Sequence, residues 1–98
     1  MKLYLWSRFL ADVDSPYQIR FSKKAQKDVE KLTVQQQLKL QQLLQNNIAI
    51  NPYLGKTFKG DLDGFYSYRL NQKDRIVYEI YEEDKVVLVV RTKTHYGD

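Results

Sequence analysis

Apolar and polar residues alternate from residue 17 to residue 21, so that Tyr17, Ile19 and Phe21 share one face of an extended chain. Strict alternation of this kind predicts a short, half-buried β-strand. Ser22 follows as a candidate helix N-cap, because a serine hydroxyl can accept a hydrogen bond from a free N–H group of the first helical turn. The pattern therefore predicts a strand that leads directly into a helix.

Two helices are predicted in the next thirty or so residues. Ala25, Val29 and Leu32 recur at i, i+4 and i+7, which places them on one face of the first helix. Thr33 and Gln36 have the spacing of a capping box and start a second helix. Leucines and isoleucines continue its apolar face as far as an Asn-Pro pair. We therefore expect an α-hairpin with almost no loop between its helices.

The second half of the chain predicts a loop and three strands. Glycines are frequent in residues 51–64, which indicates turns. Residues 65–70 and 75–82 alternate in the manner of strands, and Val86–Val90 is a continuous apolar run typical of a strand covered on both faces. The order β-α-α-β-β-β predicts an α+β fold, namely an antiparallel four-stranded sheet with the N-terminal α-hairpin packed on one face.

Residues 1–16 stand apart from this pattern and are predicted to be an N-terminal extension of a single domain formed by residues 17–98. Ser15-Pro16 ends the extension, because the residue before a proline avoids the α-helical region. The apolar start of the extension is too short and too interrupted for a secretory signal. No apolar run approaches the ~18 residues of a membrane span, so we expect a cytoplasmic protein.

Composition narrows the chemistry. The formal net charge of +4 and the pI of about 9.3 weakly favour an anionic partner. The absence of cysteine excludes disulfides and thiolate zinc sites. The chain has one histidine and neither a glycine-rich phosphate loop nor a Ser-His-Asp arrangement, so we expect neither a metal site nor another cofactor.

Cationic and aromatic side chains remain as the candidate chemistry. Arginine and lysine that converge can clamp a phosphate and stabilise charge that develops in a transition state. Aromatic rings can stack on single-stranded bases, and RNA supplies its own nucleophile in the 2′-OH group. The candidate residues are Lys56, Lys59, Arg69, Arg75, Arg91, Lys93 and His95, interleaved with Tyr66, Tyr68 and Tyr96.

Five segments carry a resemblance to a known family. They are Arg20-Phe-Ser-Lys-Lys-Ala-Gln-Lys-Asp28, Asn51-Pro-Tyr-Leu-Gly55, Gly64-Phe-Tyr-Ser-Tyr-Arg-Leu70, Asp74-Arg-Ile-Val-Tyr78 and Thr94-His-Tyr-Gly-Asp98. With these segments the chain resembles the RelE/ParE superfamily of toxins from type II toxin–antitoxin systems, and specifically its Txe/YoeB branch. The resemblance spans residues 17–98 and agrees with the predicted order of elements.

The resemblance implies a ribosome-dependent mRNA endoribonuclease, or mRNA interferase, that needs no metal or small-molecule cofactor. It implies mRNA on the ribosome, ribosomal RNA and a cognate antitoxin as partners. Carried over by position, Arg75 contacts the scissile phosphate, His95 is the general acid, and Tyr96 stacks on or orients the substrate. Arg69 supports RNA binding, and we add to the RNA-binding set Lys59, Lys93 and Tyr68.

One position departs from the family pattern. Lys56 stands where the Txe/YoeB pattern has a catalytic glutamate. Lys56 and Lys59 therefore either hold phosphates or provide a general base with a lowered pKa, and His95 is the other candidate for the base. The identity of the base stays open at this point.

Two other classes of function also stay open. A ParE-like inhibitor of DNA gyrase would need no catalytic histidine or arginine, and a catalytically inactive relative would only bind an antitoxin. Single residues have plainer interpretations as well. Arg75 could pair with Asp74 or Glu79, and Tyr96 could pack on the sheet. The cluster Lys23, Lys24, Lys27 and Lys31 is more typical of a solvated helix face than of an RNA-binding surface.

Overall fold

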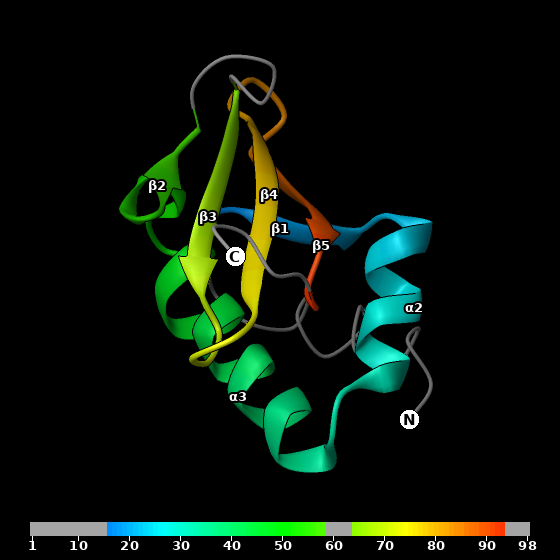
Figure 1. Ribbon diagram of the computed structural model, residues 1–98. Coiled ribbons are helices and arrows are strands. Elements are labelled where there is room, and N and C mark those ends of the chain that lie inside the picture. Colours follow the sequence, from blue (N-terminus) through cyan, green and yellow to red (C-terminus); the bar gives the residue numbers. More distant parts are fainter. Residues whose placement is uncertain (1–15, 59–63, 94–98) are drawn as a thin grey trace.

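The computed structural model describes residues 16–58 and 64–93 of the chain (Figure 1). Helices pack beside a twisted sheet, and the long strands of the sheet run through the middle of the molecule (Figure 1). In chain order the elements are β1 (Gln18–Phe21), α2 (Lys23–Lys31), α3 (Val34–Leu43), the π-helix η1 (Leu44–Ile48), the 3₁₀ helix η2 (Pro52–Leu54), β2 (Lys56–Thr57), β3 (Phe65–Arg69), β4 (Arg75–Tyr81) and β5 (Val86–Arg91).

The sheet has five strands in the order β1-β5-β4-β3-β2. The predicted α+β class is confirmed, but the predicted antiparallel, four-stranded sheet needs two corrections. Strand β1 pairs with β5 in parallel, with Ile19 opposite Val87. Alternation of apolar residues indicates which face is buried but not the direction of the partner strand. The fifth strand, β2, was missed because its two residues, Lys56 and Thr57, are too few to show alternation.

Both predicted helix starts are confirmed. The Ser22 hydroxyl accepts a hydrogen bond from the Ala25 N–H at 3.1 Å. The Thr33 hydroxyl accepts from the Gln36 N–H at 3.1 Å, and the Gln36 side chain accepts in return from the Thr33 N–H at 3.0 Å. The predicted apolar face of the first helix is buried, and Val29 is 1% exposed. These caps and this face dock α2 against β1 and β5.

The second helix departs from the expected regular pattern. It is α-helical only to Leu43 and then widens into η1, where the Ala49 N–H donates to the Leu44 carbonyl. A regular helix of about 3.6 residues per turn would rotate successive fourth residues away from the core. The wider π turn instead keeps Leu40, Leu44 and Ile48 fully buried on one face.

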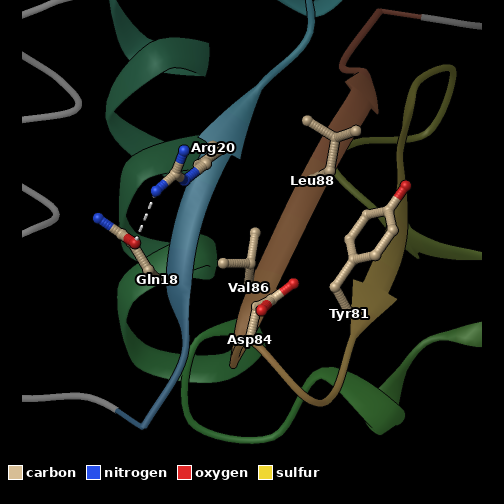
Figure 2. Close-up of a pocket in the computed structure, with 6 residues that line it drawn as sticks. All are labelled: Gln18, Arg20, Tyr81, Asp84, Val86 and Leu88. Atoms are coloured by element: carbon tan, nitrogen blue, oxygen red, sulfur yellow. Dashed lines mark hydrogen bonds between the residues drawn. The ribbon is translucent and has the colours of Figure 1, made fainter.

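Strand β5 is covered on one face, contrary to the prediction from its apolar run. Val87 and Val89 are fully buried in the core, whereas Val86 and Leu88 are half-buried on the opposite face of the sheet. That face carries a hollow of about 550 Å³ on β1, β5 and the turn before β5 (Figure 2), lined by Gln18, Arg20, Tyr81, Asp84, Val86 and Leu88. Among the described residues the helices therefore cover one side of the sheet, and we call the other side the open face.

The segment that leads into β2 is fixed to the core by Tyr78. The Tyr78 hydroxyl, fully buried, donates a hydrogen bond to the Pro52 carbonyl at 2.6 Å. Gly55 lies so close that a Cβ atom there would be 2.3 Å from the Tyr78 hydroxyl oxygen and 2.8 Å from the Ser67 carbonyl oxygen. Only glycine fits at this contact, because one of the two obstructing atoms belongs to the backbone.

We expect Gly55→Ala to lower the free energy of unfolding by about 1–3 kcal/mol, the usual cost of forcing an extra carbon into a packed site. Chemical denaturation followed by circular dichroism measures this change. Unaltered stability would contradict the close packing of η2 and β2 against Tyr78.

Candidate functional site

A second hollow on the open face gathers several of the predicted site residues. Its volume is about 300 Å³, and it lies where β2, β3 and β4 adjoin. Its cationic members, Lys56, Arg69 and Arg75, come from three different strands. We call it the cationic hollow, and its lining is Leu54, Lys56, Ser67, Tyr68, Arg69 and Arg75.

Strand register explains why these cations meet. Arg69 lies directly opposite Arg75 across β3 and β4, and Lys56 lies opposite Ser67 across β2 and β3. Residues that face each other in register share one side of a sheet, and residues two apart on a strand do so as well. Arg69 and Ser67 therefore bring both pairs to the open face. The sequence pattern alone does not reveal this convergence, because it depends on the missed strand β2.

The charges in the hollow are not neutralised by the ion pairs that the structure gives between described residues. Those pairs join Lys85 to Glu82 and Arg91 to Asp28. Arg69 is exposed and Arg75 is half-buried. Like charges placed opposite each other on adjacent strands repel and destabilise a sheet, so an anion bound between them would relieve that repulsion.

Tyr68 lines the same hollow but is committed mainly to packing. It lies opposite Ile76, and its half-buried ring packs against the hydrophobic core. Its hydroxyl accepts a hydrogen bond from the Asn47 side-chain amide at 3.0 Å. This arrangement fixes η1 to β3. RNA binding by Tyr68 stays a prediction.

Lys93 lies apart from the cationic hollow. It lines another hollow, of about 560 Å³, next to the turn between β3 and β4, together with Gln36, Asn71, Gln72, Lys73 and Asp74. The remaining predicted site residues, Lys59, His95 and Tyr96, lie outside the described residues. Their predicted roles therefore stay predictions.

Glu82, which the sequence suggested only as one of several acidic residues in a turn, anchors the segment before Lys56. Its Oε1 atom accepts hydrogen bonds from the hydroxyls of Tyr53, in η2, at 2.6 Å and of Tyr17 at 2.7 Å. Lys85 pairs with the other carboxylate oxygen, and its Nζ atom lies 5.0 Å from the centroid of the Tyr17 ring. Glu82 therefore ties the β4–β5 turn to both η2 and the entry to β1.

The same contacts shift the pKa of the groups involved. Hydrogen bonds from Lys85, Tyr53 and Tyr17 lower the pKa of the Glu82 carboxyl to about 2. The hydrogen bond to Glu82, with burial and the negative charge, raises the pKa of Tyr53 to about 12. Glu82 is therefore ionised, and Tyr53 remains a hydrogen-bond donor, throughout the neutral range.

A row of aromatic rings continues this anchor into the sheet. The rings of Tyr53 and Tyr66 meet edge to face at 5.9 Å, and those of Tyr66 and Tyr78 stack at 5.7 Å. Such pairs stabilise beyond the area that they bury. Together with the Tyr78–Pro52 hydrogen bond, they define the position of η2 and hence of Lys56.

The described residues contain no group of three or more His, Cys, Asp or Glu side chains that could hold a metal ion. Within the same part of the chain, no helix has both the length and the apolar character needed to cross a membrane.

Comparison with known proteins places the chain in a family. The family described as "ParE-like toxin of type II bacterial toxin-antitoxin system" matches residues 19–96, so the chain belongs to this family. The predicted resemblance to the RelE/ParE superfamily is thereby confirmed, and the protein is a toxin of a toxin–antitoxin module. No curated protein matches the chain significantly.

Solved structures agree in fold. A YoeB dimer from Staphylococcus aureus is 30% identical with a TM-score of 0.70, and the match covers 84% of this chain and 100% of that one. The RelBE2 toxin–antitoxin complex from Mycobacterium tuberculosis is 27% identical with a TM-score of 0.74, covering 89% of this chain and 99% of that one. A YoeB–YefM complex from S. aureus is 27% identical with a TM-score of 0.68, covering 82% and 98%. The RelE/YoeB-like fold is thus confirmed.

We expect the Glu82 anchor to make stability depend on pH in acid. The pKa of Glu82 falls from 4.5 to about 2 on folding, so its contribution is complete above pH 4.5 and is lost as the pH falls toward 2. Glu82→Gln should therefore flatten the decline of thermal stability between these pH values. An equally steep decline in the variant would contradict the anchor, and Glu83→Gln in the same exposed turn is the matched control.

Proposed function

We propose that this toxin is an endoribonuclease that cleaves mRNA on the ribosome by attack of the substrate's own 2′-OH group. The observation that supports the proposal most directly is the convergence of Lys56, Arg69 and Arg75 on one hollow of the open face. Three cations from three strands suit a phosphodiester that gains negative charge during the reaction.

In the proposed reaction, the 2′-oxygen attacks the adjacent phosphorus while the bond from phosphorus to the 5′-oxygen breaks. The products are a 2′,3′-cyclic phosphate and a free 5′-hydroxyl. Arg75, with help from Arg69 and Lys59, neutralises the charge on the phosphate. His95 protonates the departing 5′-oxygen, because an imidazole with a pKa near 6.5 transfers protons readily at neutral pH. Tyr96 orients the substrate.

The general base is assigned to Lys56 in the first instance, because it is in the cationic hollow beside Arg69 and Arg75. Neighbouring positive charges favour the neutral, proton-accepting form of a lysine. The alternative is that His95 is the base and Lys56 only holds phosphate. Base and acid contribute about 10²–10⁴-fold each to the rate. An enzyme with a weakly placed base therefore depends on the ribosome to bend and present the mRNA.

The proposed partners follow from the same site and from the relatives. The relatives from M. tuberculosis and S. aureus were solved as complexes with an antitoxin. We propose that a cognate antitoxin binds this chain and blocks the open face. The ribosomal RNA and mRNA are the anionic partners that a chain with a net charge of +4 would meet.

A second candidate function is inhibition of DNA gyrase without nuclease chemistry, and the ParE-like description of the matching family favours it. Such an inhibitor has no need for cations converging on a hollow. A supercoiling assay separates the two functions, because only the gyrase inhibitor would block supercoiling in the absence of ribosomes.

We expect Arg75→Ala to slow cleavage of ribosome-bound mRNA by about 10²–10³-fold, the usual cost of losing one donor to a transition-state oxyanion. Primer extension on the mRNA measures the rate. Lys73→Ala is the matched control, because it removes one positive charge from an exposed position near Arg75 but outside the cationic hollow. Equal rates for the two variants would assign Arg75 a structural role.

The pH dependence of cleavage distinguishes the two candidate bases. If Lys56 is the base, Lys56→Gln should abolish the rise of the cleavage rate with pH and leave the fall that reports the acid. His95→Gln should abolish the fall and prevent growth arrest when the toxin is induced. A fully toxic His95→Gln variant with an unchanged circular dichroism spectrum would remove His95 from the mechanism.

A further inference from the structure

Asp28 is a buried carboxylate outside the cationic hollow. It lies in α2, and only 5% of its surface is exposed. Every hydrogen bond that the structure gives to its carboxylate comes from the end of β5 or from the residues just beyond it. The Arg91 Nε and Nη2 atoms donate at 2.8 and 3.3 Å, and the backbone N–H groups of Thr92 and Lys93 donate at 3.0 and 3.3 Å.

These contacts hold Asp28 in its charged form. Burial raises the pKa of Asp28, but the hydrogen bonds from Arg91, Thr92 and Lys93 outweigh burial and bring the pKa below its ordinary value. A buried charge is retained in a protein when such donors surround it. The cluster is therefore a built arrangement that links α2 to a part of the chain more than sixty residues away.

The position of this link along the chain suggests its purpose. Lys93 is the last described residue, and His95 and Tyr96 follow it closely in the sequence. Fixing the N–H groups of Thr92 and Lys93 restricts the direction in which the following peptide leaves the sheet. A displacement of about 1 Å in a catalytic group can reduce a rate by about 10²-fold, so that direction bears on catalysis.

We propose that Asp28 is a positioning residue, which fixes the start of the C-terminal segment so that His95 and Tyr96 reach the cationic hollow. The proposal rests on the proposed nuclease function. Asp28 acts here through the backbone of residues 92 and 93 and has no contact with RNA. Neither the family description nor the relatives' descriptions assign this role.

A merely structural role for Asp28 predicts a different result. In that case any equally destabilising change in the helices would have the same effect on His95. Gln37 offers the matched control, because it is also a buried polar side chain, and it bonds the Val29 carbonyl at 2.8 Å near the other end of α2. Asp28→Asn and Gln37→Met are both nearly isosteric, and both remove hydrogen bonds from helix packing.

The test uses the one histidine of the chain as a probe. In the full-length protein labelled on histidine, the ring signals report His95 alone, and a synthetic peptide of residues 92–98 provides the reference for an unattached segment. We expect wild type to differ from the peptide, and Asp28→Asn to move the signals to the peptide values. Gln37→Met should leave them in place. Cleavage should fall about tenfold or more in Asp28→Asn only.

Several results would overturn the proposal. They are wild-type signals equal to those of the peptide, unchanged signals in Asp28→Asn, or equal changes in both variants. If Asp28→Asn does not fold, Arg91→Gln removes only the side-chain half of the cluster and should shift the signals part of the way; no shift would overturn the proposal. If wild type cuts no mRNA on the ribosome, the nuclease proposal fails, and the histidine signals still decide whether Asp28 fixes the segment.

Discussion

The one-sided burial of the sheet is the constraint on which the rest of the structure depends. Helices α2 and α3 with η1 supply apolar side chains to one face, where Tyr78, Val87 and Val89 are fully buried. Because side chains alternate along a strand, every second residue of β3, β4 and β5 must then point to the open face. The chain places arginine at two of those positions, Arg69 and Arg75, where packing makes no demand on the side chain.

The same constraint explains what could be predicted from the sequence. Caps and short periodic segments have local causes, so the starts at Ser22 and Thr33 and the alternation in β4 were predicted correctly. The parallel pairing of β1 with β5, the π turn at η1 and the half-buried side of β5 depend on contacts distant in sequence. A single-sequence pattern does not contain that information.

The site divides in a similar way. Residue type and family resemblance singled out Lys56, Arg69 and Arg75, and the structure brings all three to one hollow. The residues that hold the hollow in place were missed, because an acidic residue in a turn, such as Glu82, gives no sign of its partners. Glu82 accepts from two tyrosines that lie far from it in the sequence. Support of this kind is a tertiary property.

Two supports of opposite character hold the segment before Lys56. The contact at Gly55 is steric and depends on the absence of a side chain, whereas the contact at Glu82 is electrostatic and depends on a full charge. The first is insensitive to pH and salt. The second weakens in acid and at high ionic strength.

The shortness of β2 has a consequence for the free protein. A long bare strand at the margin of a sheet invites other chains to add to it and build fibrils. Here that margin is two residues long, and Lys56 places a positive charge on it. Two copies that approached along this margin would gain few backbone hydrogen bonds and would bring like charges together, so the exposed lysine also protects the chain against self-assembly.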